Sequence, residues 1–332
     1  MGPDAEKLLA DPVACTRIIQ DLRTGRPPRQ GLLYLTVGLD RTIEELSGMF
    51  EAARGGSARF LWVTGDPGEG KSHLLGLLEE LARRNRFVWA GLVHDPTRQL
   101  GLHKPGRLPR EVVLRLQRHY PEVNLDGWRW LTGDGSADRA DRLVREGLTD
   151  RLRELVRDVY LFARGRPFAG LCLAIDELEN IRLLHRRQER SAVEAIRALY
   201  AGRRSLGPFL ACFGLTPAGE SYLRAWWPEL GPVLDDGLRV GAPPLTRDLA
   251  WELARRIRAV HGAAFGGEAG PDAAEIAGRA WRAARAEPAG RRRSFVQRAV
   301  QLLETEHQRQ AGAGRRPPSR PDPPAHQPWV SG

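Results

Sequence analysis

Short apolar runs alternate with amphipathic segments through the middle of the chain. The apolar runs are RFLWVT at Arg59–Thr64, FVWAGLV at Phe87–Val93, Leu171–Ile175 and PFLACFGL at Pro208–Leu215. Runs of this kind are typical of strands that are buried on both faces of a parallel sheet. From His73 onward, HLLGLLEELARR has leucines at helical spacing, and further helical patterns separate the later runs. The alternation predicts an α/β fold with a parallel sheet covered by helices on both faces.

A glycine-rich turn joins the first apolar run to the helix that follows it. Gly65–Ser72 reads GDPGEGKS, which matches the P-loop pattern of a glycine, four residues and then Gly-Lys-Ser. The glycines allow backbone amides to point at phosphate oxygens, Lys71 can reach the β and γ phosphates of ATP, and Ser72 can bind Mg²⁺. We expect nucleotide contacts from Gly65, Asp66, Pro67, Gly68, Glu69, Gly70, Lys71, Ser72 and His73. A glycine turn without a ligand is the alternative, but a strand before the motif and a helix after it favour the P-loop.

Two acidic residues follow the third apolar run. Asp176 comes at the end of the predicted strand, where a Walker-B aspartate holds magnesium, and Glu177 comes next. A glutamate in this place can orient and deprotonate an attacking water, so the pair predicts hydrolysis rather than transfer to a second substrate. The alternative is an acidic first turn of a helix exposed to solvent. The combination with the P-loop favours the catalytic interpretation.

Three further residues are candidates for contacts with the γ phosphate. Thr216 follows the fourth apolar run and can contact the phosphate or the attacking water, or can simply begin a turn before Pro217. Arg293 precedes the last helical pattern, where a helical lid can bring it to the phosphates. Arg239 is a candidate arginine finger across a subunit interface. For both arginines, an ordinary solvated surface charge is the alternative.

The charge balance of the 332-residue chain is +10, from 51 basic and 41 acidic residues. A basic surface attracts nucleic acid. However, the basic residues are interspersed with acids, as in RLVREGLTDRLRELVRDVY, which is typical of a helix with ion pairs. No apolar run reaches the ~20 residues that cross a bilayer, so we expect a cytoplasmic protein that is not bound to a membrane.

The patterns divide the chain into four predicted parts. They are an N-terminal helical lead-in to the ATPase domain (1–58), a P-loop α/β ATPase core (59–245), a helical lid domain (246–308) and a disordered tail rich in proline and arginine (309–332).

Seven stretches, in their order along the chain, resemble the ATP-binding protein family of BREX phage-defence systems, a branch of the AAA+ ATPases related to origin-recognition-type initiators. They are RIIQDLRTGRPP, TVGLDR, GDPGEGKSHLL, AIDELENI, GLTPAGESYL, LRVGAPPLT and RRRSFVQRAVQLLE, and they cover roughly residues 12 to 305. The resemblance implies an AAA+-like fold with a C-terminal helical lid. It also implies ATP use within a multi-protein defence complex that acts on phage DNA.

Carried over by position, the resemblance assigns roles to individual residues. It implies Gly65, Gly68, Gly70, Lys71 and Ser72 for the nucleotide, Asp176 for magnesium, Glu177 as the catalytic base, Thr216 as a first sensor and Arg293 as a second sensor. Expected partners are other proteins of the defence system. The resemblance also allows direct contact with DNA and assembly into a homo-oligomer.

Three functions remain open from the sequence. The first is a Mg²⁺-dependent ATP hydrolase that couples ATP turnover to a conformational change in a protein or DNA complex. The second is a slow nucleotide-dependent switch, or a regulatory ATPase outside phage defence. The third is a DNA-binding scaffold with a vestigial P-loop, which the charge of +10 supports.

Overall fold

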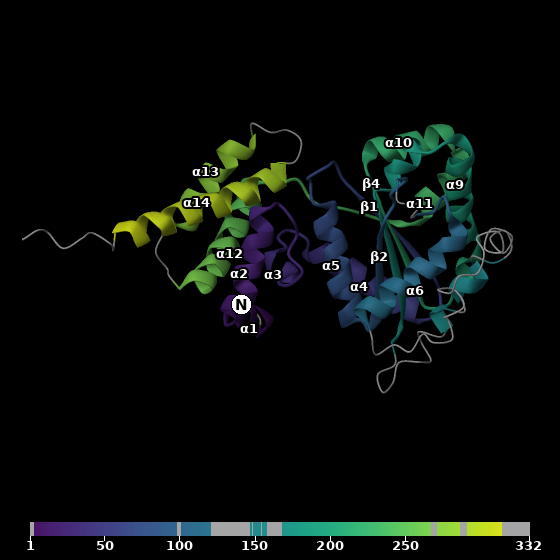
Figure 1. Ribbon diagram of the computed structural model, residues 1–332, viewed down its shortest axis with the longest axis horizontal. Coiled ribbons are helices and arrows are strands. Elements are labelled where there is room, and N and C mark those ends of the chain that lie inside the picture. Colours follow the sequence, from purple (N-terminus) through teal and green to yellow (C-terminus); the bar gives the residue numbers. More distant parts are fainter. Residues whose placement is uncertain are drawn as a thin grey trace, which may run out of the picture.

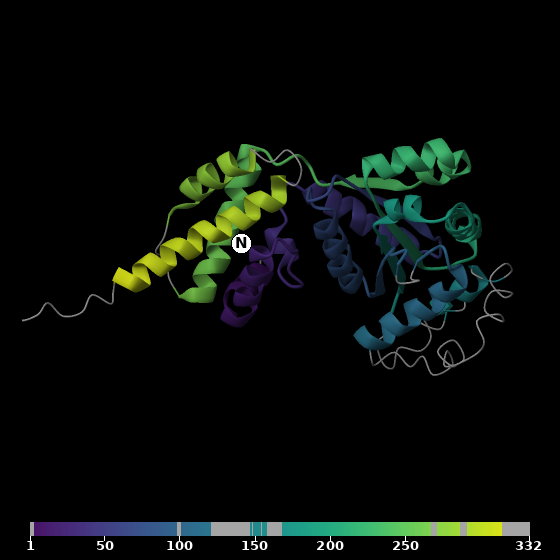
Figure 2. The same ribbon diagram turned by 45° about the horizontal axis from the view of Figure 1, so that its top comes forward.

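The computed structural model of the protein describes residues 3–97, 101–120, 147, 149–153, 155–157, 168–266, 271–285 and 291–313. The described chain forms two units (Figure 1 and Figure 2). One is a sheet with helices on both faces, and the other is a bundle of helices that contains both the N-terminal segment and the last helices. None of the helices in the described ranges is long and apolar enough to cross a membrane.

Five parallel strands form one sheet in the described part of the chain, in the spatial order β2, β3, β4, β1, β5. Their bounds are β1 Arg59–Thr64, β2 Phe87–Val93, β3 Gly170–Asp176, β4 Phe209–Leu215 and β5 Leu238–Gly241. The four apolar runs are confirmed as strands, each within one residue of its predicted ends. The predicted α/β class is likewise confirmed. The short edge strand β5 was not predicted as a strand, because only Val240 of its residues is buried.

Helices cover both faces of the sheet. Side chains alternate between the faces, so that Leu61 and Val63 of β1 pack with α4 and α5, whereas Phe60 and Trp62 pack with helices of the opposite layer. The bounds are α4 Asp40–Arg54 and α5 Lys71–Arg84 on one face, and α6 Leu108–His119, α9 Arg186–Ala201, α10 Pro217–Trp226 and α11 Gly231–Asp236 on the other. Short 3₁₀ turns occur at η1 Pro105–Arg107, η3 Leu178–Leu183, η4 Gly202–Arg204 and η5 Pro228–Leu230.

The helical unit is built from both ends of the described chain. Its elements are α1 Pro3–Leu9, α2 Pro12–Arg23, α3 Leu32–Leu35, α12 Arg247–Phe265, α13 Ala273–Arg285 and α14 Arg291–Ala313. Ile18 and Ile19 of α2 lie in one apolar core with Ile257 of α12 and Phe295 of α14. Arg23 and Glu304 form an ion pair between α2 and α14. The segment expected as a lead-in is therefore divided, with α1 and α2 in the helical unit and α4 on the sheet.

The last helix, α14, extends beyond the end of the lid domain expected at 246–308, because it continues to Ala313. The remainder of the predicted tail, 314–332, lies outside the described residues. The three cysteines, Cys15, Cys172 and Cys212, are free thiols buried in apolar cores.

The strand order brings two predicted motifs to one edge of the sheet. The chain leaves β1 into the glycine-rich turn and leaves β3 at Asp176, and β4 lies between these two strands. Because the strands are parallel and ~4.8 Å apart, the two carboxyl ends lie roughly 10 Å from each other at the same edge. This edge is where ligands bind in open α/β sheets.

Candidate nucleotide-binding site

The glycine-rich turn connects β1 to α5 as the motif predicts. Gly70 is the residue before the helix and has a φ of +111°, and Gly68 has a φ of +80°. A Cβ on Gly70 would come 3.2 Å from the Cβ of Ala242. Both positions thus have a left-handed backbone that favours glycine, and the tight approach to Ala242 adds a second constraint at Gly70. The turn leaves the first amides of α5 without helical partners, as an anion site requires.

Lys71 points back across its own turn. Its Nζ donates a hydrogen bond to the carbonyl oxygen of Gly65 at 2.9 Å, and it lies 4.0 Å from Oε1 of Glu179. The Lys71 and Glu179 side chains are only 11% and 14% exposed. Oε2 of Glu179 is buried and has no hydrogen-bond partner among the described residues. A largely buried ion pair with an unsatisfied oxygen is an arrangement that a ligand can rearrange at low cost.

The end of β3 carries the two predicted acids in different environments. Oδ1 of Asp176 accepts a hydrogen bond from the backbone N–H of Glu177 at 2.8 Å. A Cβ at Gly214 of β4 would lie 2.2 Å from that same Oδ1, so the glycine leaves room for the carboxylate. Glu177 is exposed and has a left-handed backbone, with a φ of +57°. For a residue other than glycine this conformation is sparsely populated and typical of functional sites.

Asn180 holds the Glu177 carboxylate in place. The Asn180 Nδ2 donates to Oε2 of Glu177 at 3.0 Å and to the carbonyl oxygen of His94 at 3.1 Å. His94 is the residue after β2, and its backbone N–H donates to the carbonyl oxygen of Asp176 at 2.9 Å. The ends of β2 and β3 and the first turn of η3 therefore form one hydrogen-bonded network around Glu177.

A cavity of about 520 Å³ lies between the sheet unit and the helical unit. One part is polar and is formed by the glycine-rich turn with Lys71, Ser72 and His73, and by the end of β3. Its residues on that side include Pro67, Gly68, Gly70, Asp176, Glu177, Glu179 and Asn180. The other part is more apolar and is formed by the helical unit and the loop after α2. Its residues include Leu22, Gly25, Arg26, Pro27, Pro28, Leu35, Leu253 and Val296.

Two arginines at the start of α14 line this cavity. Arg293 was predicted to come near the phosphates, and its aliphatic stem packs on Gly25, where a Cβ would meet Cγ of Arg293 at 2.9 Å. Arg292 was not predicted. Its Nη2 donates to the carbonyl oxygen of Pro243 at 2.6 Å, and its buried Nε has no hydrogen-bond partner in the described ranges. Burial lowers the pKa of Arg292, and this effect is opposed by the nearby Glu69.

His73 joins the glycine-rich turn to the N-terminal segment. Its Nε2 lies 2.8 Å from Oγ1 of Thr36, and Thr36 in turn donates to the carbonyl oxygen of Leu32. Since the Thr36 hydroxyl proton is used in the bond to Leu32, it accepts from the Nε2 proton of a neutral imidazole. Burial, with a contribution from Arg292, lowers the pKa of His73 to about 4. The imidazole is therefore neutral at pH 7.

Thr216 lies outside the set of residues that line the cavity. Its Oγ1 accepts a hydrogen bond from the backbone N–H of Gly219 at 3.1 Å and caps the N-terminus of α10. The capping alternative from the sequence is thus present in the structure. The sensor role of Thr216 stays a prediction.

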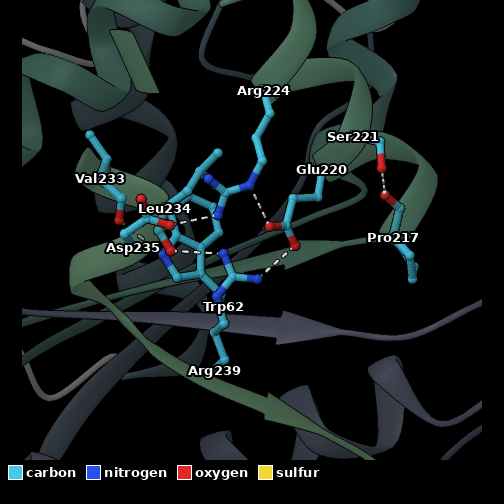
Figure 3. A network of polar contacts seen from close by, with 9 residues as sticks. All are labelled: Trp62, Pro217, Glu220, Ser221, Arg224, Val233, Leu234, Asp235 and Arg239. Carbon is cyan, nitrogen blue, oxygen red and sulfur yellow. Dashed lines mark hydrogen bonds and ion pairs between the residues drawn. The ribbon is translucent and has the colours of Figure 1, made fainter. Parts of the chain in front are cut away.

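Arg239 also lies away from the cavity. Its Nη1 donates to Oε2 of Glu220 at 2.7 Å and its Nη2 donates to the carbonyl oxygen of Leu234 at 2.8 Å (Figure 3). Glu220 also accepts from Arg224, and the two guanidinium groups, Arg239 first, lower the pKa of this carboxyl. A role for Arg239 as a finger toward another subunit would require this ion pair to open.

The residues that line the cavity fit a nucleoside triphosphate with magnesium. A volume of about 520 Å³ is in the range of small-molecule sites. The Ser72 hydroxyl and the Asp176 carboxylate are oxygen ligands of the kind that Mg²⁺ prefers. The unsatisfied Nε of Arg292 is a donor for a phosphate oxygen. The glycine-rich turn supplies the backbone amides, and the apolar part of the cavity suits a purine ring.

Several of these residues could not be assigned from the sequence. Glu179 and Asn180 follow the Walker-B pair in ELEN, and their side chains reach the cavity because η3 begins directly after Glu177. Arg292 is the second of three consecutive arginines, so the sequence does not distinguish it from its neighbours. The loop at 25–28 also lines the cavity, and nothing in its sequence GRPP indicates a chemical role.

The parallel sheet, the glycine-rich turn after β1 and the acids at the end of β3 form the arrangement of a P-loop nucleotide-binding fold. A family model described as "BREX system ATP-binding protein BrxC/D" matches residues 12–124, about a third of the chain, and it confirms the resemblance over that part. No curated protein matches the chain.

Two solved structures of origin-recognition proteins are similar to this chain, and the first supports the same fold. The ORC2 protein of Aeropyrum pernix, in complexes with ADPNP and ADP, is 13% identical, with a TM-score of 0.52, and the match covers 84% of this chain and 65% of that one. The Drosophila ORC bound to DNA is 17% identical, with a TM-score of 0.47, and the match covers 86% of this chain and 61% of that one. This chain therefore spans less than two thirds of the length of either structure.

Proposed function

We propose that the protein binds ATP with Mg²⁺ in the cavity between its two units and hydrolyses it. The observation that carries the proposal is the convergence of three distant segments on one cavity: the glycine-rich turn, the acidic end of β3 and the arginines of α14. The matched family model and the AAA+-type fold support the same conclusion.

Different residues of the cavity bind the phosphates and the base of the nucleotide. The amides of the glycine-rich turn and the Lys71 ammonium hold the phosphates, and Arg292 and Arg293 add positive charge from the helical unit. The apolar part of the cavity, with Leu22, Leu253 and others from the helical unit, holds the base. Binding therefore links the two units through one ligand.

Ser72 and Asp176 hold the magnesium ion in this proposal. The bound ion neutralises charge that develops on the phosphate oxygens. Glu177 orients the attacking water and accepts its proton. Thr216 and Arg293 are proposed as the first and second sensors. The family resemblance supports both roles, and Arg293 also lines the cavity.

The proposed hydrolysis cycle changes the position of the helical unit relative to the sheet. Arg292 and Arg293 begin α14, and α14 packs on α2 and α12 in one apolar core. A change in the charge of the phosphates therefore changes the electrostatic force on these arginines, and the packed helical unit moves with them. We place this cycle in a BREX-type phage-defence complex. There the conformational change acts on other proteins of the system, on DNA or on further copies of this chain.

Titration with a fluorescent ATP analogue in the presence of Mg²⁺ tests the binding part of the proposal. Lys71→Ala removes the one ammonium in the cavity lining, so we expect at least a tenfold rise in Kd. Lys7→Ala, an exposed lysine of α1, is the matched control and leaves Kd unchanged. Binding that is equal in all three proteins, or absent from the wild type, would contradict the proposal.

A specific observation favours a slow nucleotide switch as the second candidate. The Glu177 carboxylate is held by Asn180 rather than directed freely at a water. In a slow switch, wild-type phosphate release is negligible and Asn180→Ala increases it. If Asn180→Ala leaves a substantial wild-type rate unchanged or lowers it, the hydrolase is favoured instead.

A further inference from the structure

A second surface combines exposed apolar and basic side chains on the sheet unit. Leu183 at the end of η3 is 66% exposed and Trp226 at the end of α10 is 57% exposed, which are high values for large apolar residues. Arg186 begins α9 and its guanidinium lies 5.0 Å from the centroid of the Trp226 ring. We call the surface formed by Arg182, Leu183, Arg186, Arg187 and Trp226 the Arg186 surface. In Figure 1, α9 lies at the end of the sheet unit remote from the helical unit, and α10 lies along its top.

The fold holds the Arg186 guanidinium in one position although its side chain is 58% exposed. Its Nη1 donates to Oε2 of Glu189 at 2.9 Å, and its guanidinium also lies 4.6 Å from the Trp227 ring centroid. Glu189 is buried, and its other oxygen accepts a hydrogen bond from the Tyr222 hydroxyl at 2.6 Å. An exposed arginine ordinarily loses considerable rotamer entropy when it binds a partner. Here that entropy is lost on folding, so the guanidinium is pre-organised for an anion.

The positive charge around Arg186 is only partly compensated. Residues 182–190 contain four arginines and one glutamate, and the glutamate is the buried partner of Arg186. Arg182 and Arg187 are exposed, and neither forms an ion pair with a described residue. By contrast, Arg83 and Arg84 of α5 pair with acids one turn away. The Arg186 surface is therefore a net positive patch beside an exposed indole.

We propose that the Arg186 surface binds a single strand of nucleic acid. The arginines contact phosphates, and the indole of Trp226 stacks on an unpaired base, which is the combination that sequence-tolerant single-strand binding uses. An acidic peptide satisfies the arginines but makes little use of an exposed indole beside a fixed guanidinium. This inference does not depend on the proposed ATPase activity. The two sites are nevertheless connected, because η3 begins at the residue after Glu177 and ends at Leu183.

Fluorescence anisotropy with a labelled 20-nucleotide single-stranded DNA, without ATP, tests the proposal. We expect saturable binding that weakens with salt and is tighter than binding to a duplex of equal length. Trp226→Ala is expected to weaken binding about tenfold, from loss of base stacking. Arg182→Glu with Arg187→Glu is expected to weaken it at least as much and to reduce the salt dependence.

Matched controls separate a local effect from a general one. Trp251→Ala removes an exposed indole of α12, and Arg282→Glu with Arg285→Glu reverses two exposed charges of α13. Both controls should bind the DNA as the wild type does, and thermal unfolding should confirm that all variants are folded. Wild-type protein that does not bind the single strand, or Trp226→Ala that binds it normally, would overturn the proposal. Equal displacement of the DNA by poly-glutamate would also overturn it, since the surface would then fit an acidic protein segment.

Discussion

Lys71 has two partners within the protein that a bound phosphate would have to replace. In the structure it is satisfied by the Gly65 carbonyl and by the Glu179 carboxylate. A phosphate group that binds in the cavity must compete with both. Under the proposed function, Glu179 competes with the phosphates for Lys71 and so weakens nucleotide binding.

Glu179→Gln removes a negative charge that lies beside Lys71 and faces the phosphates. We expect the Kd for the ATP analogue to fall about fivefold, which is roughly 1 kcal/mol of binding free energy. Glu80→Gln, on α5 and outside the nucleotide cavity, is the control and should have no effect. A weaker Kd for Glu179→Gln would show instead that the carboxylate helps to bind the nucleotide.

Protonation of His94 lowers the free energy of unfolding at acidic pH. The side chain is fully buried, its Nε2 has no hydrogen-bond partner among the described residues, and burial lowers its pKa from 6.5 to about 4. The unfolded chain thus binds a proton more readily than the folded one, so stability is complete above pH 6.5 and is lost as the pH falls toward 4. From this group alone, we expect a loss of about 2 kcal/mol in unfolding free energy between pH 7 and pH 5.

Urea unfolding at pH 7 and pH 5 measures this loss. In His94→Gln the side chain no longer titrates, so the loss between the two pH values should be smaller by about 2 kcal/mol. His73 and His261, whose pKa values are also lowered to about 4, account for part of the remaining loss. An unchanged loss in the variant would show that His94 does not titrate differently in the folded and unfolded states.

At the scale of elements, the register between β3 and β4 places the Asp176 carboxylate. Gly214 of β4 lies beside Asp176 and has no side chain to collide with that carboxylate. Gly278 of α13 has no heavy atom within 4 Å of the position of a Cβ, which makes it the matched control.

Gly214→Ala is expected to displace Asp176 and to reduce Mg²⁺-dependent phosphate release at least tenfold, because the new Cβ would lie 2.2 Å from Oδ1. Gly278→Ala should leave the activity unchanged and increase stability by about 0.5 to 1 kcal/mol, since alanine favours the helix. Normal activity in Gly214→Ala would exclude a role for the position of Asp176.

The sequence was most informative about the secondary-structure elements. Continuous apolar runs predicted β1 to β4, because strands buried on both faces need apolar residues at every position. The edge strand β5 lacks such a run. The sequence predicted a helical lead-in over 1–58 without its internal boundaries. In the structure, Asp11 accepts hydrogen bonds from the N–H groups of Val13 and Ala14 and starts α2 as a helix separate from α1.

At the scale of the whole molecule, the helical unit depends on contacts between the two ends of the described chain. Local patterns predict α2 and α14 but not that they pack together, since that contact joins residues almost 300 positions apart. For the same reason the P-loop and the Walker-B acids could be predicted individually, whereas Arg292, Asn180 and the loop after α2 could not be assigned to their cavity.

Ile19→Ala tests whether α2 is part of the helical unit that binds the nucleotide. Ile19 is fully buried in the core of this unit, so we expect a loss of about 2 to 4 kcal/mol in stability and weaker binding of the ATP analogue. Val13→Ala, an exposed apolar residue of the same helix, is the control and should have little effect. Thermal unfolding and nucleotide titration of both variants provide the measurement.

Phosphate release from ATP by the wild type and by Glu177→Gln, measured with Mg²⁺ and alongside nucleotide binding, tests the proposed hydrolase most directly. We expect steady release by the wild type and a loss of about 100-fold or more in the variant, with ATP binding retained, because the amide cannot accept the proton of the attacking water. Negligible release by the wild type, or equal release by the two proteins, would contradict hydrolysis at this site.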